Sequence, residues 1–220
     1  MSIAQNLNKI KESLAKQVTL VAVSKTKPVS DIMQAYHAGQ RVFGENKIQD
    51  MAEKYEAMPK DIQWHMIGHV QRNKVKYMAG FVSLIHGVDS LKLLEEINKQ
   101  ALKHDRVINC LLQIKIAEED SKFGITQASA EKILDSEAFS KLNNINIAGL
   151  MGMATFTDNE AQIKDEFTAL NKIFNTLKTK NHPNCNMQTL SMGMSGDYNL
   201  AIACGSTMVR VGSRIFGVRS

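Results

Sequence analysis

The sequence predicts an α/β protein, a single (β/α)8 TIM barrel with an extra N-terminal helix, formed by residues 1–220 as one domain. Short apolar runs rich in β-branched residues alternate with longer segments of helical period, which is typical of a parallel sheet covered by helices. Eight such runs are present, seven of them followed by a helical segment. The chain of 220 residues also has the length of single-domain α/β barrels, which run to about 200–250 residues.

The predicted strands lie at 18–26, 41–46, 62–68, 81–89, 107–116, 145–155, 186–193 and 207–217. Helical segments lie between them, most clearly at 90–105 and 160–180, and one amphipathic helix precedes the first strand. In the second of these segments, apolar residues recur at spacings of three and four and predict one buried face: Ile163, Phe167, Leu170, Phe174 and Leu177. Right-handed crossovers leave an open doubly wound sheet or a closed barrel, and the count of eight favours the barrel.

The composition is that of an ordinary globular protein, with 44% hydrophobic and 22% charged residues. Cys110, Cys185 and Cys204 form no CxxC pair, which excludes zinc-ribbon, thioredoxin-like and disulfide-scaffold proteins. No apolar run reaches the roughly 18 residues of a membrane helix, and the N-terminus lacks the apolar segment of a signal peptide. We therefore expect a cytoplasmic monomer that has no membrane partner.

The net charge of +5 is modest, and its distribution carries more information. Residues 66–80 contain no carboxylate but contain Arg72, Lys74 and Lys76. Residues 198–220 also contain no carboxylate but contain Arg210, Arg214 and Arg219. Segments of this kind attract anions. For residues 66–80, a basic face exposed to solvent explains the lysines equally well. The Arg72–Lys76 stretch lacks interleaved aromatic residues, so we expect no nucleic-acid partner.

A lysine stands at the end of the first predicted strand. In AVSKTKP, Lys25 follows the apolar run and Pro28 ends the extended segment. Barrel proteins carry their functional residues where the strands end. There, partial desolvation favours the neutral amine, which is a nucleophile toward carbonyl carbon. A lysine that extends into solvent is the alternative.

The next two strand ends carry polar residues. Asn46 follows the second strand, where it can orient a ligand or cap the next helix. His65 and His69 are four residues apart, but Gly68 and the strand pattern argue against a helical metal-binding pair, so we expect no metal site. We expect Met66 to be a barrel-interior side chain and His69 to begin the loop at the mouth of the barrel.

The last two strands predict a phosphate site. They carry SMGMSGD (191–197) and GSTMVRVGSRIFG (205–217), whose small residues let backbone N–H groups approach a phosphate. Arg210 alternates with Met208, so it can point inward, where it needs an anionic or ring-nitrogen partner. The glycines alone are also compatible with tight turns. With Lys25, this site predicts a ligand that carries an aldehyde and a phosphate: pyridoxal 5′-phosphate, or a sugar phosphate in a Schiff-base aldolase.

Six segments together resemble the YggS/PROSC family of pyridoxal 5′-phosphate homeostasis proteins. They are AVSKTKP (22–28), FGEN followed by Gln49, WHMIGHVQRNKVKY (64–77), KFGI (122–125), GLMGMA (149–154) and the segment 191–217. The resemblance spans almost the whole chain and implies a barrel like the N-terminal domain of alanine racemase, without that enzyme's β-domain. It implies that Lys25 forms a Schiff base with the cofactor. It further implies that Asn46 and Met66 lie against the cofactor, that Ser191 and the backbone of Gly212 and Ser213 hold its phosphate, and that Arg210 faces the pyridine nitrogen.

The function implied by the resemblance is buffering and delivery of pyridoxal 5′-phosphate through a reversible Schiff base on Lys25. Such a protein supports amino-acid and keto-acid balance, delivers the cofactor to apo-enzymes that depend on it, and is not a robust enzyme itself. The alternative is an amino-acid racemase with Lys25 as one base. A racemase needs a second acid or base, which its relatives take from the β-domain, and no spacing in this sequence selects Tyr198 or His69 as a substitute. Asp50 and Ala154-Thr155 depart from the family pattern and leave the proposed cofactor contacts intact.

Overall fold

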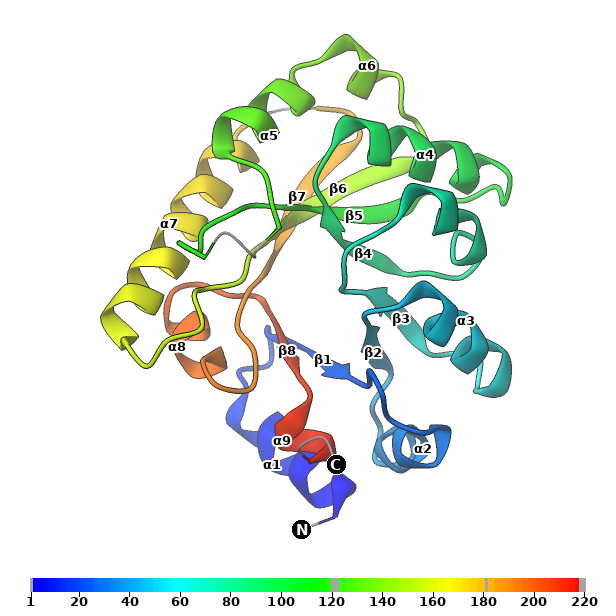
Figure 1. The fold of residues 1–220 in the computed structure, drawn as a ribbon, viewed down its shortest axis with the longest axis vertical. Coiled ribbons are helices and arrows are strands. Elements are labelled where there is room, and N and C mark those ends of the chain that lie inside the picture. The colour runs from blue at the N-terminus through cyan, green and yellow to red at the C-terminus, as the bar shows by residue number, and fades with distance from the viewer. Residues whose placement is uncertain (1, 120–122, 181, 218–220) are drawn as a thin grey trace.

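The computed structural model describes residues 2–119, 123–180 and 182–217, so Lys122 of the KFGI segment and Arg219 lie outside it. Within these ranges, eight parallel strands pair in chain order, and β1 pairs with β8 to close the barrel (Figure 1). The strands are β1 (Thr19–Val23), β2 (Val42–Glu45), β3 (Gln63–Met66), β4 (Leu84–Val88), β5 (Ile108–Gln113), β6 (Ile145–Met151), β7 (Cys185–Ser191) and β8 (Met208–Val211). Each strand lies inside its predicted range, except that β7 begins one residue earlier, so the barrel prediction is confirmed.

Helices fill the connections between the strands and surround the barrel (Figure 1). They are α1 (Ile3–Ser13), α2 (Val29–His37), α3 (Ile48–Ala57), the 3₁₀ helix η1 (Arg72–Tyr77), α4 (Leu91–Leu102), α5 (Gln127–Leu134), α6 (Glu137–Ser140), α7 (Glu160–Lys178), α8 (Tyr198–Ala203) and α9 (Ser213–Phe216). The extra helix α1 precedes β1 as predicted and begins with a capping box between Ser2 and Gln5. It lies beside α9, where Asn6 Nδ2 donates to the carbonyl oxygen of Ile215 at 3.2 Å.

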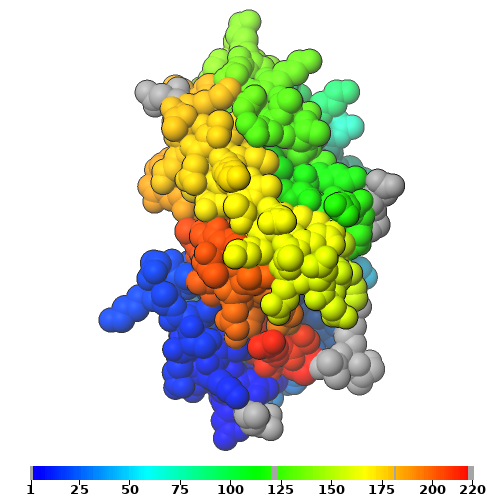
Figure 2. Space-filling model, turned by 90° about the vertical axis from the view of Figure 1, so that its left-hand side faces the viewer, coloured from blue at the N-terminus to red at the C-terminus, as the bar shows by residue number. Residues whose placement is uncertain are grey.

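The longest helix, α7, shows how the predicted amphipathic pattern folds. Its N-cap, Asn159, accepts a hydrogen bond from the Gln162 N–H, and the whole predicted apolar stripe is buried. Each large apolar side chain buried in this way stabilises the fold by roughly 1.5–3 kcal/mol. In Figure 2, α7 (yellow) lies beside α8 (orange), where Thr168 Oγ1 is 3.9 Å from Cys204 Sγ. No helix in the described part of the chain is both long and apolar enough to cross a membrane.

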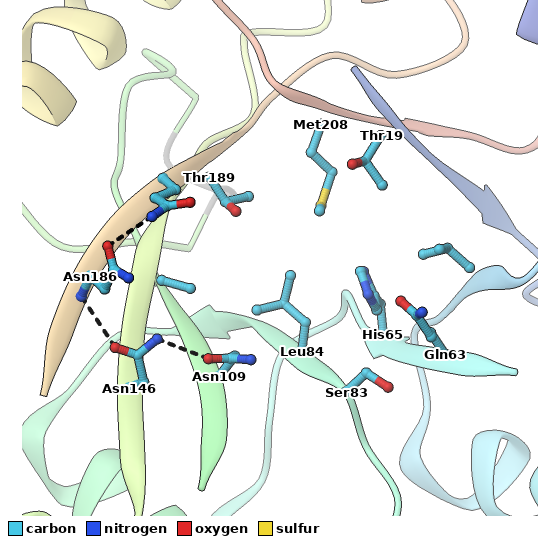
Figure 3. A pocket seen from close by; sticks show the side chains of 13 residues that line it. Thr19, Gln63, His65, Ser83, Leu84, Asn109, Asn146, Asn186, Thr189 and Met208 are labelled. Atoms are coloured by element: carbon cyan, nitrogen blue, oxygen red, sulfur yellow. Dashed lines mark hydrogen bonds between the residues drawn. The ribbon is translucent and has the colours of Figure 1, made fainter. Parts of the chain in front are cut away.

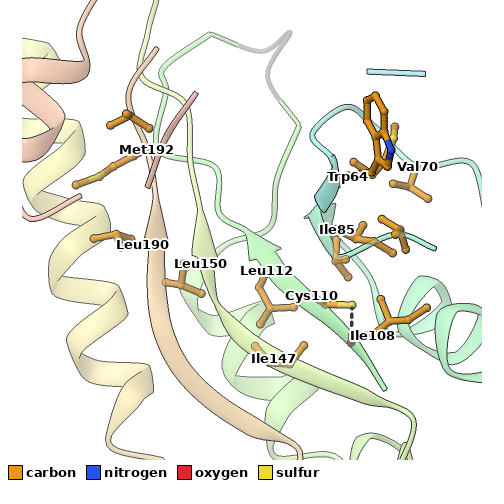
Figure 4. Packing of buried hydrophobic residues seen from close by; sticks show 14 of the residues in the cluster. Trp64, Val70, Ile85, Ile108, Cys110, Leu112, Ile147, Leu150, Leu190 and Met192 are labelled. Carbon is orange, nitrogen blue, oxygen red and sulfur yellow. Dashed lines mark hydrogen bonds between the residues drawn. The ribbon is translucent and has the colours of Figure 1, made fainter. Parts of the chain in front are cut away.

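Strand pleating divides the core into two layers, because successive side chains point to opposite faces. The outer layer packs the strands against the helices and includes Trp64, Ile85, Cys110 and Leu112 (Figure 4). A smaller cluster fills part of the barrel interior: Val21, Leu84, Leu111, Met151 and Met208. Buried polar side chains occupy the rest of this interior, and they lead to the site at its carboxyl end.

Candidate functional site

A cavity of about 630 Å³ lies at the carboxyl ends of the strands. Residues that follow β1, β2, β3, β6, β7 and β8 line it, together with Gln113 at the end of β5. Among the predicted site residues, those that line this cavity are Lys25, Asn46, Arg210, Gly212 and Ser213. The structure thus brings together predicted site residues that are up to 188 positions apart in the sequence, from Lys25 to Ser213.

Lys25 is half-buried and stands two residues beyond the end of β1. The next residue, Thr26, has a φ of +64°, in the left-handed region that β-branched residues rarely adopt. Such a conformation costs about 1–3 kcal/mol and persists only where the surrounding structure holds it. The backbone is therefore strained directly after the lysine, as is common at ligand sites.

A buried polar network supports the backbone from which Lys25 extends. Lys54 Nζ, on α3, donates to Glu45 Oε1 at 2.7 Å and to the carbonyl oxygen of Ser24 at 2.9 Å. The Ser24 hydroxyl donates to the same carboxylate oxygen at 2.6 Å. Burial raises the pKa of Glu45, and the hydrogen bonds from Lys54 and Ser24 oppose that rise. The network ties the ends of β1 and β2 to α3 immediately behind Lys25.

Asn46 lines the cavity, and the structure does not use it as a helix cap. The N-cap of α3 is Lys47, which makes no side-chain capping hydrogen bond. The backbone of Asn46 packs against Gly68, where an added Cβ would lie only 2.3 Å from the Asn46 carbonyl oxygen. Only glycine permits this close approach, which sets the end of β3 against the end of β2.

Arg210 lies at the floor of the cavity and is only 4% exposed. Its Nη1 donates to the carbonyl oxygen and Oγ of Ser191 at 2.8 and 2.6 Å, and its Nη2 donates to the carbonyl oxygen of Gly152 at 3.0 Å. Burial lowers its pKa to about 10, although the charge of Asp197 raises it, so the guanidinium stays charged at neutral pH. No carboxylate of the described residues forms an ion pair with it. A buried cation held only by neutral oxygens favours an electron-rich ligand beside it.

The turn between β8 and α9 forms the other end of the cavity. The Gly212 N–H lies 3.2 Å from Ser195 Oγ, and both residues line the cavity beside Ser213. An added Cβ at Gly212 would lie 3.1 Å from the Val23 carbonyl oxygen, so glycine keeps this turn close to β1. A serine hydroxyl and backbone N–H groups together are suited to bind a phosphate.

Ser191 lies inside the barrel and is not among the residues that line the cavity. It is fully buried inside the barrel, where its Oγ accepts from Arg210 and lies 3.1 Å from His86 Nδ1. The serine of the SMGMSGD segment that reaches the cavity is Ser195, four residues later. The sequence prediction selected the serine at the strand end, whereas the half-buried Ser195 lies in the loop beyond that end.

The prediction that Met66 is a barrel-interior side chain is wrong. His65 and Ile67, its neighbours in sequence, line cavities inside the barrel, so pleating directs Met66 to the outside. It is 1% exposed and packs in the outer core layer with Trp64. The structure does not bring Met66 to the cavity that Lys25 lines.

Several cavity residues were not predicted. Gln113 is buried and its Nε2 donates to the carbonyl oxygen of Phe123 at 2.9 Å, which anchors the loop after β5. Phe123 and Phe156 stand at the cavity wall and are 54% and 93% exposed. For Gln113, its polar side chain at the end of an apolar strand was the sequence feature that could have indicated a cavity residue. Phe123 belongs to the KFGI segment of the family resemblance, but neither that segment nor the context of Phe156 indicates which loop lies at the mouth of the barrel.

The histidines do not form a metal site with each other. His69 lines the cavity mouth and stacks on Phe123 with ring centroids 4.6 Å apart, while His65 lies inside the barrel against His86. In the ranges that the structure describes, no cluster of three or more histidine, cysteine or acidic residues could hold a metal ion. The basic residues Arg72 and Lys76 lie exposed on η1.

The fold and the site define a (β/α)8-barrel protein in which a lysine and the Gly212–Ser213 turn line one cavity at the carboxyl ends of the strands. The chain belongs to the family described as alanine racemase, N-terminal domain, whose model matches residues 1–220, and within it to the pyridoxal phosphate homeostasis proteins. It is 40% identical to the pyridoxal phosphate homeostasis protein of Pasteurella multocida over 100% of this chain and 98% of that protein. It is 36% identical to the Escherichia coli K12 protein of the same name, over 99% of this chain and 97% of that protein.

Solved structures agree with this assignment. PipY of Synechococcus elongatus, solved with pyridoxal phosphate bound, shares 34% identity and a TM-score of 0.89, covering 98% of this chain and 100% of PipY. The alanine racemase of Bartonella henselae has a TM-score of 0.74 at 17% identity, and the match covers 98% of this chain but 58% of the racemase. The similarity to alanine racemase, at 17% identity, shows the barrel fold alone.

Proposed function

We propose that this protein binds pyridoxal 5′-phosphate in the carboxyl-end cavity and takes part in homeostasis of that cofactor. The observation that carries this function is that Lys25, Arg210 and the Ser195–Gly212 pair line one cavity of about 630 Å³. An amine, a buried cation and a phosphate-binding turn match the aldehyde, ring nitrogen and phosphate of this cofactor. The relatives named for the same function, and PipY with its bound cofactor, support it.

Each group has a role in holding the cofactor. When bound, pyridoxal 5′-phosphate supplies an aldehyde, and the Lys25 amine condenses with it reversibly with loss of water. Ser195 and the backbone N–H groups of Gly212 and Ser213 hold the phosphate, and Asn46 borders the ring. Val23 and Ile67 give the cavity apolar walls against which a flat ring packs. Binding of this kind needs no second substrate.

Arg210 favours storage of the cofactor over catalysis. A guanidinium beside the pyridine nitrogen disfavours protonation of that nitrogen, because two positive charges would then adjoin. An unprotonated ring withdraws electrons less strongly from a bound amino acid. We therefore propose a cytoplasmic monomer that buffers the cofactor, delivers it to dependent apo-enzymes and has no robust turnover of its own.

The alternative function is amino-acid racemisation. Of its two candidate second bases, Tyr198 is 5% exposed and packs in the core, while His69 lines the cavity. Exchange of enantiomers across a panel of amino acids tests this alternative. Turnover that is lost in Lys25→Ala and reduced in His69→Gln would establish a racemase and contradict the carrier function.

Transfer of the cofactor tests the carrier function directly. The protein is loaded with pyridoxal 5′-phosphate, freed of excess cofactor and mixed with an apo-enzyme whose activity reports cofactor gain. We expect the activity to appear at a rate that depends on the loaded protein's concentration, while Lys25→Ala carries over no cofactor. Loaded protein that never releases cofactor to the apo-enzyme would contradict a delivery role.

A further inference from the structure

Four buried polar side chains form a continuous chain of hydrogen bonds through the barrel interior. Arg210 Nη1 lies 2.6 Å from Ser191 Oγ, which lies 3.1 Å from His86 Nδ1, and His86 Nε2 lies 3.1 Å from His65 Nδ1. The four residues come from β8, β7, β4 and β3, and none is more than 4% exposed. We call this chain the core relay.

The core relay connects the two ends of the barrel. Arg210 lines the carboxyl-end cavity, whereas His65 lines a second cavity of about 390 Å³ at the opposite, amino end (Figure 3). Neutral amides surround that second cavity, among them Asn109 and Asn146, whose side chains are hydrogen-bonded to each other at 2.9 Å. Its described lining contains no carboxylate and no lysine or arginine. A residue at the amino end is therefore linked by hydrogen bonds to the floor of the cofactor cavity.

One assignment of donors and acceptors gives the Ser191 hydroxyl hydrogen a partner within this chain. An arginine can only donate, so Ser191 Oγ accepts from Arg210 and its own hydrogen is available for His86 Nδ1. When Ser191 donates that hydrogen, His86 Nδ1 is an unprotonated acceptor, which places the ring hydrogen on Nε2, where it is donated to His65 Nδ1. His65 in turn carries its hydrogen on Nε2. All links are satisfied when both histidines are neutral, and burial lowers the pKa of both, that of His65 to about 3.

The relay constrains Arg210 where it meets the ligand. Both hydrogens of Nη1 are donated to Ser191, and one hydrogen of Nη2 is donated to Gly152. These three bonds, to Ser191 at the end of β7 and to Gly152 directly after β6, set the plane of the guanidinium, so its remaining N–H groups have a fixed direction. Loss of the acceptor at His86 would leave the Ser191 hydrogen without a partner, and Ser191 could rotate away from Arg210.

We propose that His86 and His65 are positioning residues that act through Ser191 to orient Arg210 toward the ring of the bound cofactor. This role rests on the proposed function, in which pyridoxal 5′-phosphate occupies the carboxyl-end cavity. Neither histidine touches that cavity, so their effect on the cofactor is transmitted through the core relay.

Nuclear magnetic resonance of the cofactor-free protein tests the relay without any ligand. Long-range ¹H–¹⁵N spectra distinguish the two neutral tautomers, and spectra of His65→Gln and His86→Gln assign the signals among the six histidines. We expect both residues to be neutral with the hydrogen on Nε2 from pH 6 to 8. An Nδ1-protonated tautomer at either position would overturn the proposal, whether or not the protein binds cofactor.

Cofactor binding tests the positioning role. In His86→Leu we expect the affinity for pyridoxal 5′-phosphate to fall about tenfold, the effect of losing one hydrogen bond, and the absorption maximum of bound cofactor to shift. His86→Gln keeps one acceptor and one donor and should restore both readouts toward wild type. Met66→Leu is the matched control, because Met66 is equally buried but lies outside the barrel wall.

The outcomes separate the two hypotheses. A wild-type protein that binds no cofactor would contradict the proposed function while leaving the tautomer result to decide the relay. Wild-type affinity and spectrum in a folded His86→Leu would overturn the positioning role. If His86→Leu does not fold, His65→Leu takes its place under the same criteria, and unchanged affinity and spectrum in folded His65→Leu likewise overturn it.

Discussion

The Lys54 ammonium lies 2.7 Å from the Glu45 carboxylate, and the two side chains are 11% and 0% exposed. Because Lys54 also holds the Ser24 carbonyl oxygen, this ion pair supports the residue that precedes Lys25. Removal of one partner leaves the other charge buried and unpaired, which costs about 3–5 kcal/mol. We expect Lys54→Met to lower the free energy of unfolding by that amount in urea titrations.

A matched surface pair provides the control. Lys141 and Glu137 also form an ion pair, but their side chains are 70% and 83% exposed, so Lys141→Met should leave the unfolding midpoint nearly unchanged. The double variant Glu45→Gln/Lys54→Met removes both charges and should recover part of the loss. Equal stabilities of Lys54→Met and Lys141→Met would contradict a structural role for the buried pair.

Ser195 should contribute to phosphate binding. Its hydroxyl oxygen accepts a hydrogen bond from the Gly212 N–H at 3.2 Å in the proposed phosphate site, and a hydrogen bond to a charged group contributes about 1.5–3 kcal/mol. We therefore expect Ser195→Ala to weaken binding of pyridoxal 5′-phosphate by about tenfold to a hundredfold in absorbance titrations. Pyridoxal, which lacks the phosphate, serves as the control ligand. If Ser195→Ala weakens binding of both ligands equally, Ser195 does not hold the phosphate.

Met66 should matter for stability and not for the ligand. Truncation of a buried methionine to alanine costs about 2–5 kcal/mol through lost burial and the cavity left behind. We expect Met66→Ala to lose stability in this range, while the protein that remains folded binds the cofactor with wild-type affinity. A large loss of affinity without a loss of stability would restore the sequence-based prediction that Met66 contacts the cofactor.

The buried histidines should make stability depend on pH. Burial lowers the pKa of His65 from 6.5 to about 3, so below pH 6.5 the unfolded chain binds a proton that the folded protein does not. Its contribution is fully present above pH 6.5 and is lost toward pH 3, by about 1.4 kcal/mol per pH unit. Between pH 6 and 4.5, the unfolding free energy of His65→Gln should therefore fall less steeply than that of wild type. Parallel slopes for the two proteins would show that His65 is protonated in the folded state.

The sequence predicts the barrel well because its signals are local. Apolar runs and helical periods repeat along the chain, and Lys25, Asn46, Gly212 and Ser213 stand at recognisable element ends. Met66 shows the limit, since Trp64 and Met66 are apolar on one face of β3 while His65 and Ile67 occupy the other. Only the closed barrel decides which face is inside.

The core relay could not be predicted from sequence patterns. His86 and Ser191 are 105 residues apart, and His65 and His86 are 21 apart, with no shared motif that relates them. Their contacts arise because β3, β4, β7 and β8 all direct side chains toward one barrel axis. The Ser24–Glu45–Lys54 network likewise joins the residue that follows β1 to residues of β2 and α3, so it appears only in the folded chain.

The most direct measurement is to reduce the protein with borohydride after adding pyridoxal 5′-phosphate and to locate the modified lysine by peptide mass mapping. We expect a visible absorption band before reduction and a single modified residue, Lys25, with neither in Lys25→Ala. Modification of Lys27 in its place, or no band and no modification in folded wild-type protein, would contradict the central claim that Lys25 holds the cofactor in this cavity.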